Sequence, residues 1–100
     1  MNGHDPAFDA EHPSGQVMFR SARAGHLHSV VLGEAAMRTD PRILARAILL
    51  AAQVSHLKAV ASIRRDIIAA GMTPSATLAG PADLDRAHAE LFGHRLRPDL

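Results

Sequence analysis

Cysteine, tryptophan and tyrosine are absent from this 100-residue chain, and only three residues are phenylalanine. Without cysteine the chain can form no disulfide, bind no metal through thiolates and use no cysteine nucleophile. With so few aromatic rings, stacking contributes little to its core or to ligand recognition. What remains is an aliphatic composition, 47% hydrophobic and rich in alanine, which is typical of a mainly helical protein.

Long apolar runs are missing as well. A membrane-spanning helix needs ~18 or more apolar residues, and Arg46 and Gln53 interrupt the longest run, from Ile43 to Val54. The N-terminal residues are acidic and lack the basic start and apolar centre of a signal peptide. We therefore expect no membrane insertion and a cytoplasmic protein.

The sequence also has few signs of chemistry. Seven histidines invite a metal-site interpretation, and His26 and His28 would share one face of a strand, but no other histidine stands at a metal-motif spacing from this pair. No serine lies in a nucleophile-elbow motif, and neither a phosphate-binding glycine loop nor a dinucleotide fingerprint occurs. The sequence thus predicts no catalytic, cofactor-binding or metal-binding residues, and no enzyme.

The signals that are present predict an α+β fold. Two prolines, three acids and one large apolar side chain in residues 1–14 indicate a flexible acidic arm. Residues 16–23 and 27–32 are typical of strands, and Ala24-Gly25 between them favours a turn, which predicts an antiparallel hairpin.

A long helix is predicted next. Asp40-Pro41 favours a helix start, because the carboxylate accepts from first-turn N–H groups and proline at the first position loses no needed donor. No glycine or proline follows until Gly71, the expected left-handed cap. A short helix is predicted from Pro81 to Phe92. The predicted organisation is an arm at 1–14, one domain at 15–95 and a tail at 96–100.

The long helix is apolar around most of its circumference. One seam follows a spacing of four and three, and a second lies beside it, at Leu44, Ile48, Ala52, Ala59 and Ile63. The hairpin can cover only one seam. We expect the same helix of a second subunit to cover the other, and a fold-back of the C-terminal segment is the alternative. The predicted dimer or partner interface comprises Ile43, Ala47, Leu50, Val54, Leu57, Ala61, Leu84 and Leu91.

Charge is unevenly distributed along the chain. The net charge is +1, but residues 16–65 carry +6 between acidic ends. Arginines of this basic middle could contact nucleic-acid phosphates. The alternative is that they form the hydrophilic rims of an apolar element, since no aromatic partner or base-reading motif accompanies them. The candidate contacts are Arg20, Arg23, Arg42, Arg46, Arg64 and Arg65.

Short motifs occur in a fixed order along the domain: Gly15-x-Val17, Gly25-x-Leu27-x-x-Val30-x-Leu32, Asp40-Pro41, Leu44-Ala45-x-x-Ile48, Lys58-Ala59, and Pro81 through Phe92 to Arg95. This order resembles the YbaB-like nucleoid-associated fold. It is more closely similar to the mycobacterial Esp proteins of type VII (ESX) secretion, of the EspD and EspH kind. The resemblance implies a small antiparallel sheet before a long helix, and a homodimer. The long acidic extension of those Esp proteins is reduced here to a short arm, and the N-terminal helix of YbaB proteins has no counterpart.

The resemblance and the surplus apolar helix surface predict a non-enzymatic, dimeric accessory or chaperone-like protein of type VII secretion. It would act by protein–protein interaction, with a secretion substrate or another Esp-like protein as partner, and a type VII system could also export it. The alternative is a YbaB-like nucleoid protein that binds DNA with little sequence preference.

Overall fold

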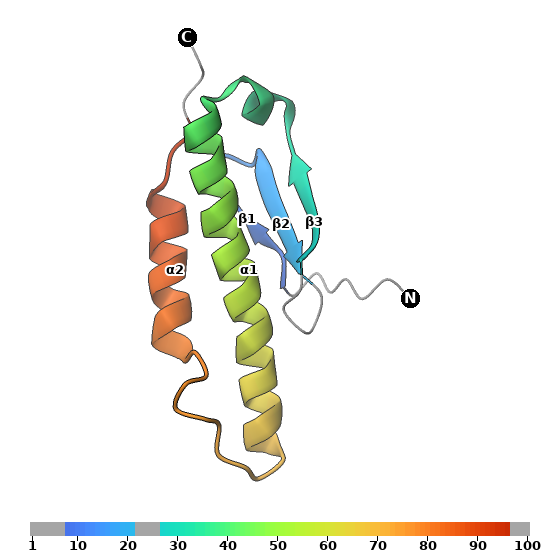
Figure 1. The fold of residues 1–100 in the computed structure, drawn as a ribbon, viewed down its shortest axis with the longest axis vertical. Coiled ribbons are helices and arrows are strands. Elements are labelled where there is room, and N and C mark those ends of the chain that lie inside the picture. The colour runs from blue at the N-terminus through green and yellow to red at the C-terminus, as the bar shows by residue number, and fades with distance from the viewer. Residues whose placement is uncertain (1–7, 22–26, 97–100) are drawn as a thin grey trace.

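The computed structural model describes residues 8–21 and 27–96 of the chain. Figure 1 shows an antiparallel sheet in the order β1-β2-β3, on which α1 packs, while α2 lies along the flank of α1 farther from β3. This arrangement confirms the predicted α+β class. The elements are β1 (Ala10–Glu11), β2 (Val17–Ser21), β3 (Leu27–Leu32), the 3-10 helix η2 (Glu34–Arg38), α1 (Pro41–Ala69) and α2 (Pro81–Gly93).

The sheet owes its two faces to the alternation of side chains along β2. Val17, Phe19 and Ser21 are buried on the side of α1, whereas Met18 and Arg20 point to the other face and are half-buried. In the β2–β3 register, Val17 pairs with Leu32. The predicted hairpin is thereby confirmed, although its predicted turn at Ala24-Gly25 lies outside the described residues.

Both ends of α1 form as the sequence predicts. The Asp40 carboxylate accepts a hydrogen bond of 2.8 Å from the Arg42 backbone N–H, and Pro41 occupies the first helical position. At the other end Gly71 takes a left-handed φ of 81°, and the Met72 N–H donates to the Ile67 carbonyl. The helix of 29 residues is therefore about 43 Å long.

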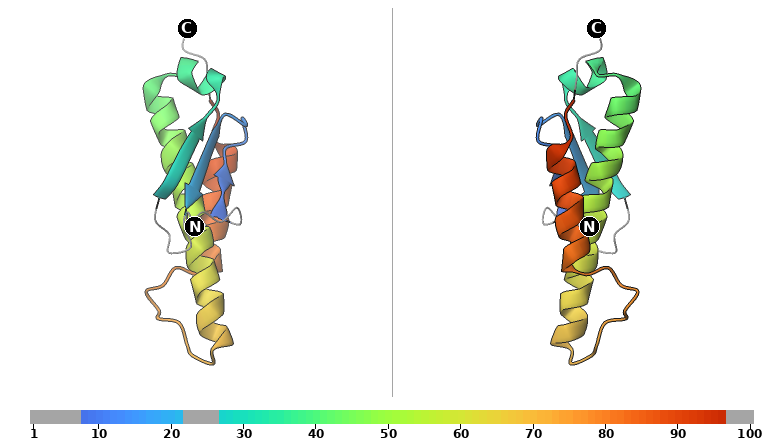
Figure 2. Two further views of the ribbon diagram at one scale, coloured as in Figure 1. Left: turned by 90° about the vertical axis from the view of Figure 1, so that its right-hand side faces the viewer. Right: turned by 90° about the vertical axis from the view of Figure 1, so that its left-hand side faces the viewer.

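Helix α2 covers one flank of α1, as the side views in Figure 2 also show. Its apolar stripe places Ala87 and Leu91 in the core cluster that contains Leu50 and Val54 of α1. The Gly80 backbone N–H donates to the Asp83 carboxylate at 2.8 Å, which fixes the start of the helix. The C-terminal segment thus folds back on α1. This was the predicted alternative to a second subunit, and it is what covers this flank.

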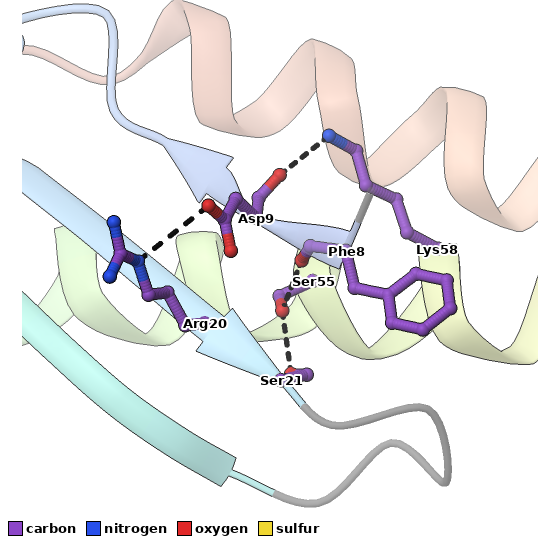
Figure 3. A network of polar contacts seen from close by, with 6 residues as sticks. All are labelled: Phe8, Asp9, Arg20, Ser21, Ser55 and Lys58. Carbon is purple, nitrogen blue, oxygen red and sulfur yellow. Dashed lines mark hydrogen bonds and ion pairs between the residues drawn. The ribbon is translucent and has the colours of Figure 1, made fainter. Parts of the chain in front are cut away.

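Residues 8–14 correct the expected flexible arm. Ala10 and Glu11 form strand β1 beside β2, and Phe8 and His12 are buried. Polar contacts from Ser55, Lys58 and Arg20 fasten this segment, as Figure 3 shows. The Ser55 hydroxyl contacts both the Phe8 carbonyl and the Ser21 hydroxyl at 2.6 Å, the Lys58 ammonium donates to the Asp9 carbonyl at 2.7 Å, and Arg20 lies 3.6 Å from the Asp9 carboxylate.

The outer parts of α1 remain apolar and uncovered. By length and composition alone α1 is apolar enough to cross a membrane, which is weak evidence because core helices of soluble proteins pass the same test. Leu49 on its outward side is 62% exposed, and Ile68 near its end is exposed too. Residues 8–21 and 27–96 therefore leave part of the outward face of α1 uncovered.

Candidate functional site

Strand β3 is the first component of the candidate site. Three consecutive apolar residues are exposed there: Val30 by 36%, Val31 by 45% and Leu32 by 37%. Val30 and Leu32 lie on the side of α1 and are exposed because α1 packs chiefly on β2 and also on β1, so that β3 extends beyond the helix (Figure 1). Val31 pairs with Met18 and points to the opposite face of the sheet. Since β3 ends the sheet, one of its sides has no neighbouring strand among the described residues. We call this side, together with the three side chains, the β3 edge.

The flank of α1 on the side of β3 is the second component. It carries the second apolar seam, of which Ile48, Ala52 and Ile63 are half-buried and Ala59 is fully buried. The opposite flank faces α2, as the ion pair between Arg46 and Glu90 at 3.6 Å shows. Val30 and Leu32 on the helix side of β3 and the half-buried residues of this flank are apolar groups of the kind that a protein-binding site uses.

A groove between β1 and α2 is a separate feature. It encloses about 620 Å³, and Glu11, Lys58 and His88 contribute polar groups beside apolar ones such as Leu91. The exposed ring of Phe92 stacks on His88, with ring centroids 5.5 Å apart. Within the described residues no group of three or more His, Asp or Glu side chains could hold a metal ion. The groove therefore offers mixed contacts to a partner side chain and lacks an arrangement for metal chemistry.

Two histidines join the ends of the domain. His12 Nδ1 accepts from the Ser14 backbone N–H at 3.0 Å, so in the neutral ring the proton resides on Nε2, which donates to His94 Nδ1 at 3.0 Å. Burial, then the charges of His94 and Arg95, lower the pKa of His12. Burial and then the charge of Arg46 lower the pKa of His94. The pair is thus held neutral and connects the segment after β1 to the end of α2.

No sequence pattern predicts this histidine pair. His12 and His94 lie 82 positions apart, and His12 fell in the segment expected to be flexible. Only the antiparallel return of α2 along α1 brings them together. Ser55 and Lys58 were missed for the same reason, since each contacts a segment more than 40 residues away.

The structure corrects part of the predicted interface. Among its residues, Leu50 and Val54 of α1 are buried against the sheet and α2 rather than presented to a second chain. Ala47 and Leu91 are fully buried as well. These four side chains belong to the core of the single chain, because α2 packs on the seam of α1 that contains Leu50 and Val54. The remaining residues of the predicted interface are half-buried, and their contact with a second chain stays a prediction. They are Ile43, Leu57, Ala61 and Leu84.

The candidate arginines do not gather on one surface. Arg20 lies 3.6 Å from Asp9, Arg42 lies 3.8 Å from Asp40, and Arg46 is paired with Glu90. The other two described members of the predicted set stand near the far end of α1, about 35 Å from its start at 1.5 Å per residue. They are Arg64 and Arg65. Arg23 lies outside the described residues. The predicted contacts thus form scattered charges, most of them beside a carboxylate.

Comparison with known proteins places the chain in a family. Residues 1–97 match the family described as "Protein of unknown function (DUF2694)". The chain is 53% identical over 97 residues to the "Uncharacterized protein Rv0028" of Mycobacterium tuberculosis (strain ATCC 25618 / H37Rv), a match covering 97% of this chain and 96% of the relative. The same figures hold for the "Uncharacterized protein Mb0029" of Mycobacterium bovis (strain ATCC BAA-935 / AF2122/97).

No solved structure matches the chain significantly. The matched proteins carry neither an Esp nor a YbaB name, so that resemblance stays a prediction. The family match extends over nearly the whole chain, including strand β1 and helix α2. The chain therefore belongs to the DUF2694 family.

Proposed function

We propose that this protein is a non-enzymatic, protein-binding accessory protein that works as a homodimer. The observation that carries the proposal is the run of three exposed apolar residues on β3, an end strand of the sheet. Exposed contiguous apolar surface on a small protein marks a place where another protein binds. The uncovered Leu49 on the outward side of α1 extends the apolar surface available to a partner.

The proposed setting is type VII secretion. The ordered motifs that resemble the Esp proteins support this setting, and mycobacterial relatives are consistent with it. In this setting the protein binds a secretion substrate or another Esp-like protein in the cytoplasm. It would keep the apolar surface of that partner covered before export.

The alternative of DNA binding has weaker support. A protein that binds DNA without sequence preference needs several cations along one surface to neutralise phosphates. Here Arg20, Arg42 and Arg46 each already lie beside a carboxylate of the chain itself. A mobility-shift assay at ~50 mM salt tests this alternative, since phosphate binding is strongest at low salt. A clear shift that weakens steeply with added salt would favour the alternative over the proposal.

The test of the proposal is copurification from a mycobacterial host with the tagged chain. The critical variant is Leu49→Asp, which places a charge on the outward apolar side of α1, and the matched control is Gln53→Asp, which places the same charge on an exposed position one turn later. The proposal predicts recovery of a type VII substrate or another Esp-like protein with the parent chain and the control, and reduced recovery with Leu49→Asp. Recovery of neither class of partner with the parent chain would contradict it.

A further inference from the structure

The backbone of β3 has hydrogen-bonding groups directed away from the sheet. The Gly33 N–H donates to the Gln16 carbonyl at 2.7 Å, which makes this a hydrogen-bonded pair in the antiparallel ladder. Such pairs alternate with non-bonded ones, so the bonded pairs continue at Val31 and Ser29 of β3. The N–H and C=O groups of Val30 and Leu32 therefore point outward, where no described strand meets them.

This edge lacks the usual protection against pairing. Native sheets guard an exposed edge with charged side chains, proline or a covering element. The six residues of β3 include no Lys, Arg, Asp, Glu or Pro, and three of them expose apolar side chains. By contrast β1 at the other end of the sheet is only two residues long, and it carries the charged Glu11 and follows Asp9. An extended strand is thus the partner that the β3 edge fits.

The exposed surface of the chain as a whole exceeds that of a compact protein of its mass. The chain exposes 6335 Å², whereas a compact protein of its mass, 10.7 kDa, exposes about 5,500 Å². The excess is about 800 Å², which is what each partner buries in an interface of standard size. The Cα radius of gyration, 14.8 Å, also exceeds the ~13 Å of a compact chain of this length.

We propose that two copies of the chain join β3 edge to β3 edge, antiparallel about a two-fold axis, in one continuous six-stranded sheet. This inference rests on the homodimer in the proposed function and assigns its interface. An antiparallel edge strand complements itself, because the outward N–H and C=O groups of one copy meet those of the other. No like charges meet, since β3 carries none.

The two-fold arrangement also covers two of the three apolar side chains of the β3 edge. Both α1 helices then lie on the same face of the joined sheet, with the two β3 strands between them. Val30 and Leu32, which point to the helix side, come to lie between the facing flanks of the two helices. The half-buried Ile48 and Ala52 of each copy lie on the flank that faces this shared space. The half-buried residues of the second apolar seam of α1 thereby receive cover beyond what residues 8–21 and 27–96 supply.

The test uses the absence of cysteine from the chain. Single cysteines are introduced in turn at residues 29–32, and the purified proteins are mildly oxidised. The two-fold places equivalent residues near the axis within the Cα separation of about 4.4–6.8 Å that a disulfide needs. We expect a cross-linked dimer that peaks at the position nearest the axis and declines on both sides. Ala89→Cys on the exposed side of α2 is the control and should remain uncross-linked at the same concentration.

A charge exchange provides the second readout. Val30→Lys and Val30→Glu should each weaken the dimer at least about tenfold, because like charges then meet across the axis. Both variants should keep the circular dichroism of the parent, since Val30 is already partly exposed. Mixing the two should restore a one-to-one dimer.

The outcomes separate this inference from the proposed function. A dimer by light scattering that neither cross-links through β3 nor responds to the charged variants would overturn the β3 pairing and leave the homodimer standing. A monomer at micromolar concentration would overturn both the pairing and the homodimer. In that case copurification would still decide whether the chain binds another protein.

Discussion

Truncation of Leu91 tests how the chain covers its own core. The side chain is only 1% exposed and belongs to the core cluster that joins α2 to α1. Replacement of a fully buried leucine by alanine costs about 2–5 kcal/mol, from lost transfer free energy and the cavity that remains. The whole free energy of unfolding of a domain this size is about 5–15 kcal/mol. Leu91→Ala should therefore remove a large part of the stability of the fold.

The adjacent residue provides a matched control. Phe92 follows Leu91 on α2, is 55% exposed and contacts the ring of His88. Phe92→Ala should cost about 1 kcal/mol, because more than half of the residue stays in water in the folded chain. Urea denaturation followed by circular dichroism measures both variants against the parent at one protein concentration. If Leu91→Ala costs no more than Phe92→Ala, Leu91 does not hold α2 in the core and the fold-back of α2 is refuted.

Three further predictions concern the polar contacts and the helix end. The lowered pKa values of His12 and His94 mean that the folded state favours their neutral forms. Their contribution to stability is therefore complete above the unfolded pKa of ~6.5 and is lost as pH falls below it. The urea midpoint should drop between pH 7.5 and 5.5. Ser55→Ala should cost about 1–3 kcal/mol in urea denaturation, because it leaves the Ser21 hydroxyl buried without this partner. Gly71→Ala should lower the free energy of unfolding by about 1 kcal/mol, because alanine is strained at the left-handed φ of 81°. No atom within 4 Å would meet the added methyl, so a steric clash adds nothing to this loss.

Each of these has its own control. His94→Gln should reduce the dependence of the urea midpoint on pH, and an unchanged dependence would remove the histidine pair as its source. Ser62→Ala on α1 should be close to neutral, and an equal loss for both serines would contradict the role of the Ser55 contacts. Ala70→Gly, which changes the residue next to Gly71 without a left-handed φ, separates backbone strain from a general effect at this helix end.

The elements that sequence reasoning predicted well carry local signals. The start of α1 follows from Asp40-Pro41, whose carboxylate and ring act within one turn, and its end follows from Gly71. The hairpin follows from the apolar character of two short segments around a turn signal. Such signals act over a few residues, so a single chain displays them without any knowledge of the tertiary fold.

The parts that were missed depend on contacts between distant segments. Strand β1 has only two residues and is held by Ser55 and Lys58 of α1, which no pattern near residue 10 announces. The periodicity of α1 correctly showed more than one buried side. It could not decide whether α2 or a second chain covers the seam with Leu50 and Val54, because both would bury the same side chains. The exposed β3 edge was also missed, since its exposure depends on where α1 crosses the sheet.

The mass of the protein in solution tests the central claim most directly. The claim is that the uncovered β3 edge and α1 flank are completed by a second copy. Light scattering at micromolar concentration should give twice the 10.7 kDa of the chain for the parent and a mass close to 10.7 kDa for Val30→Lys. A parent protein with the mass of a single chain would contradict the claim.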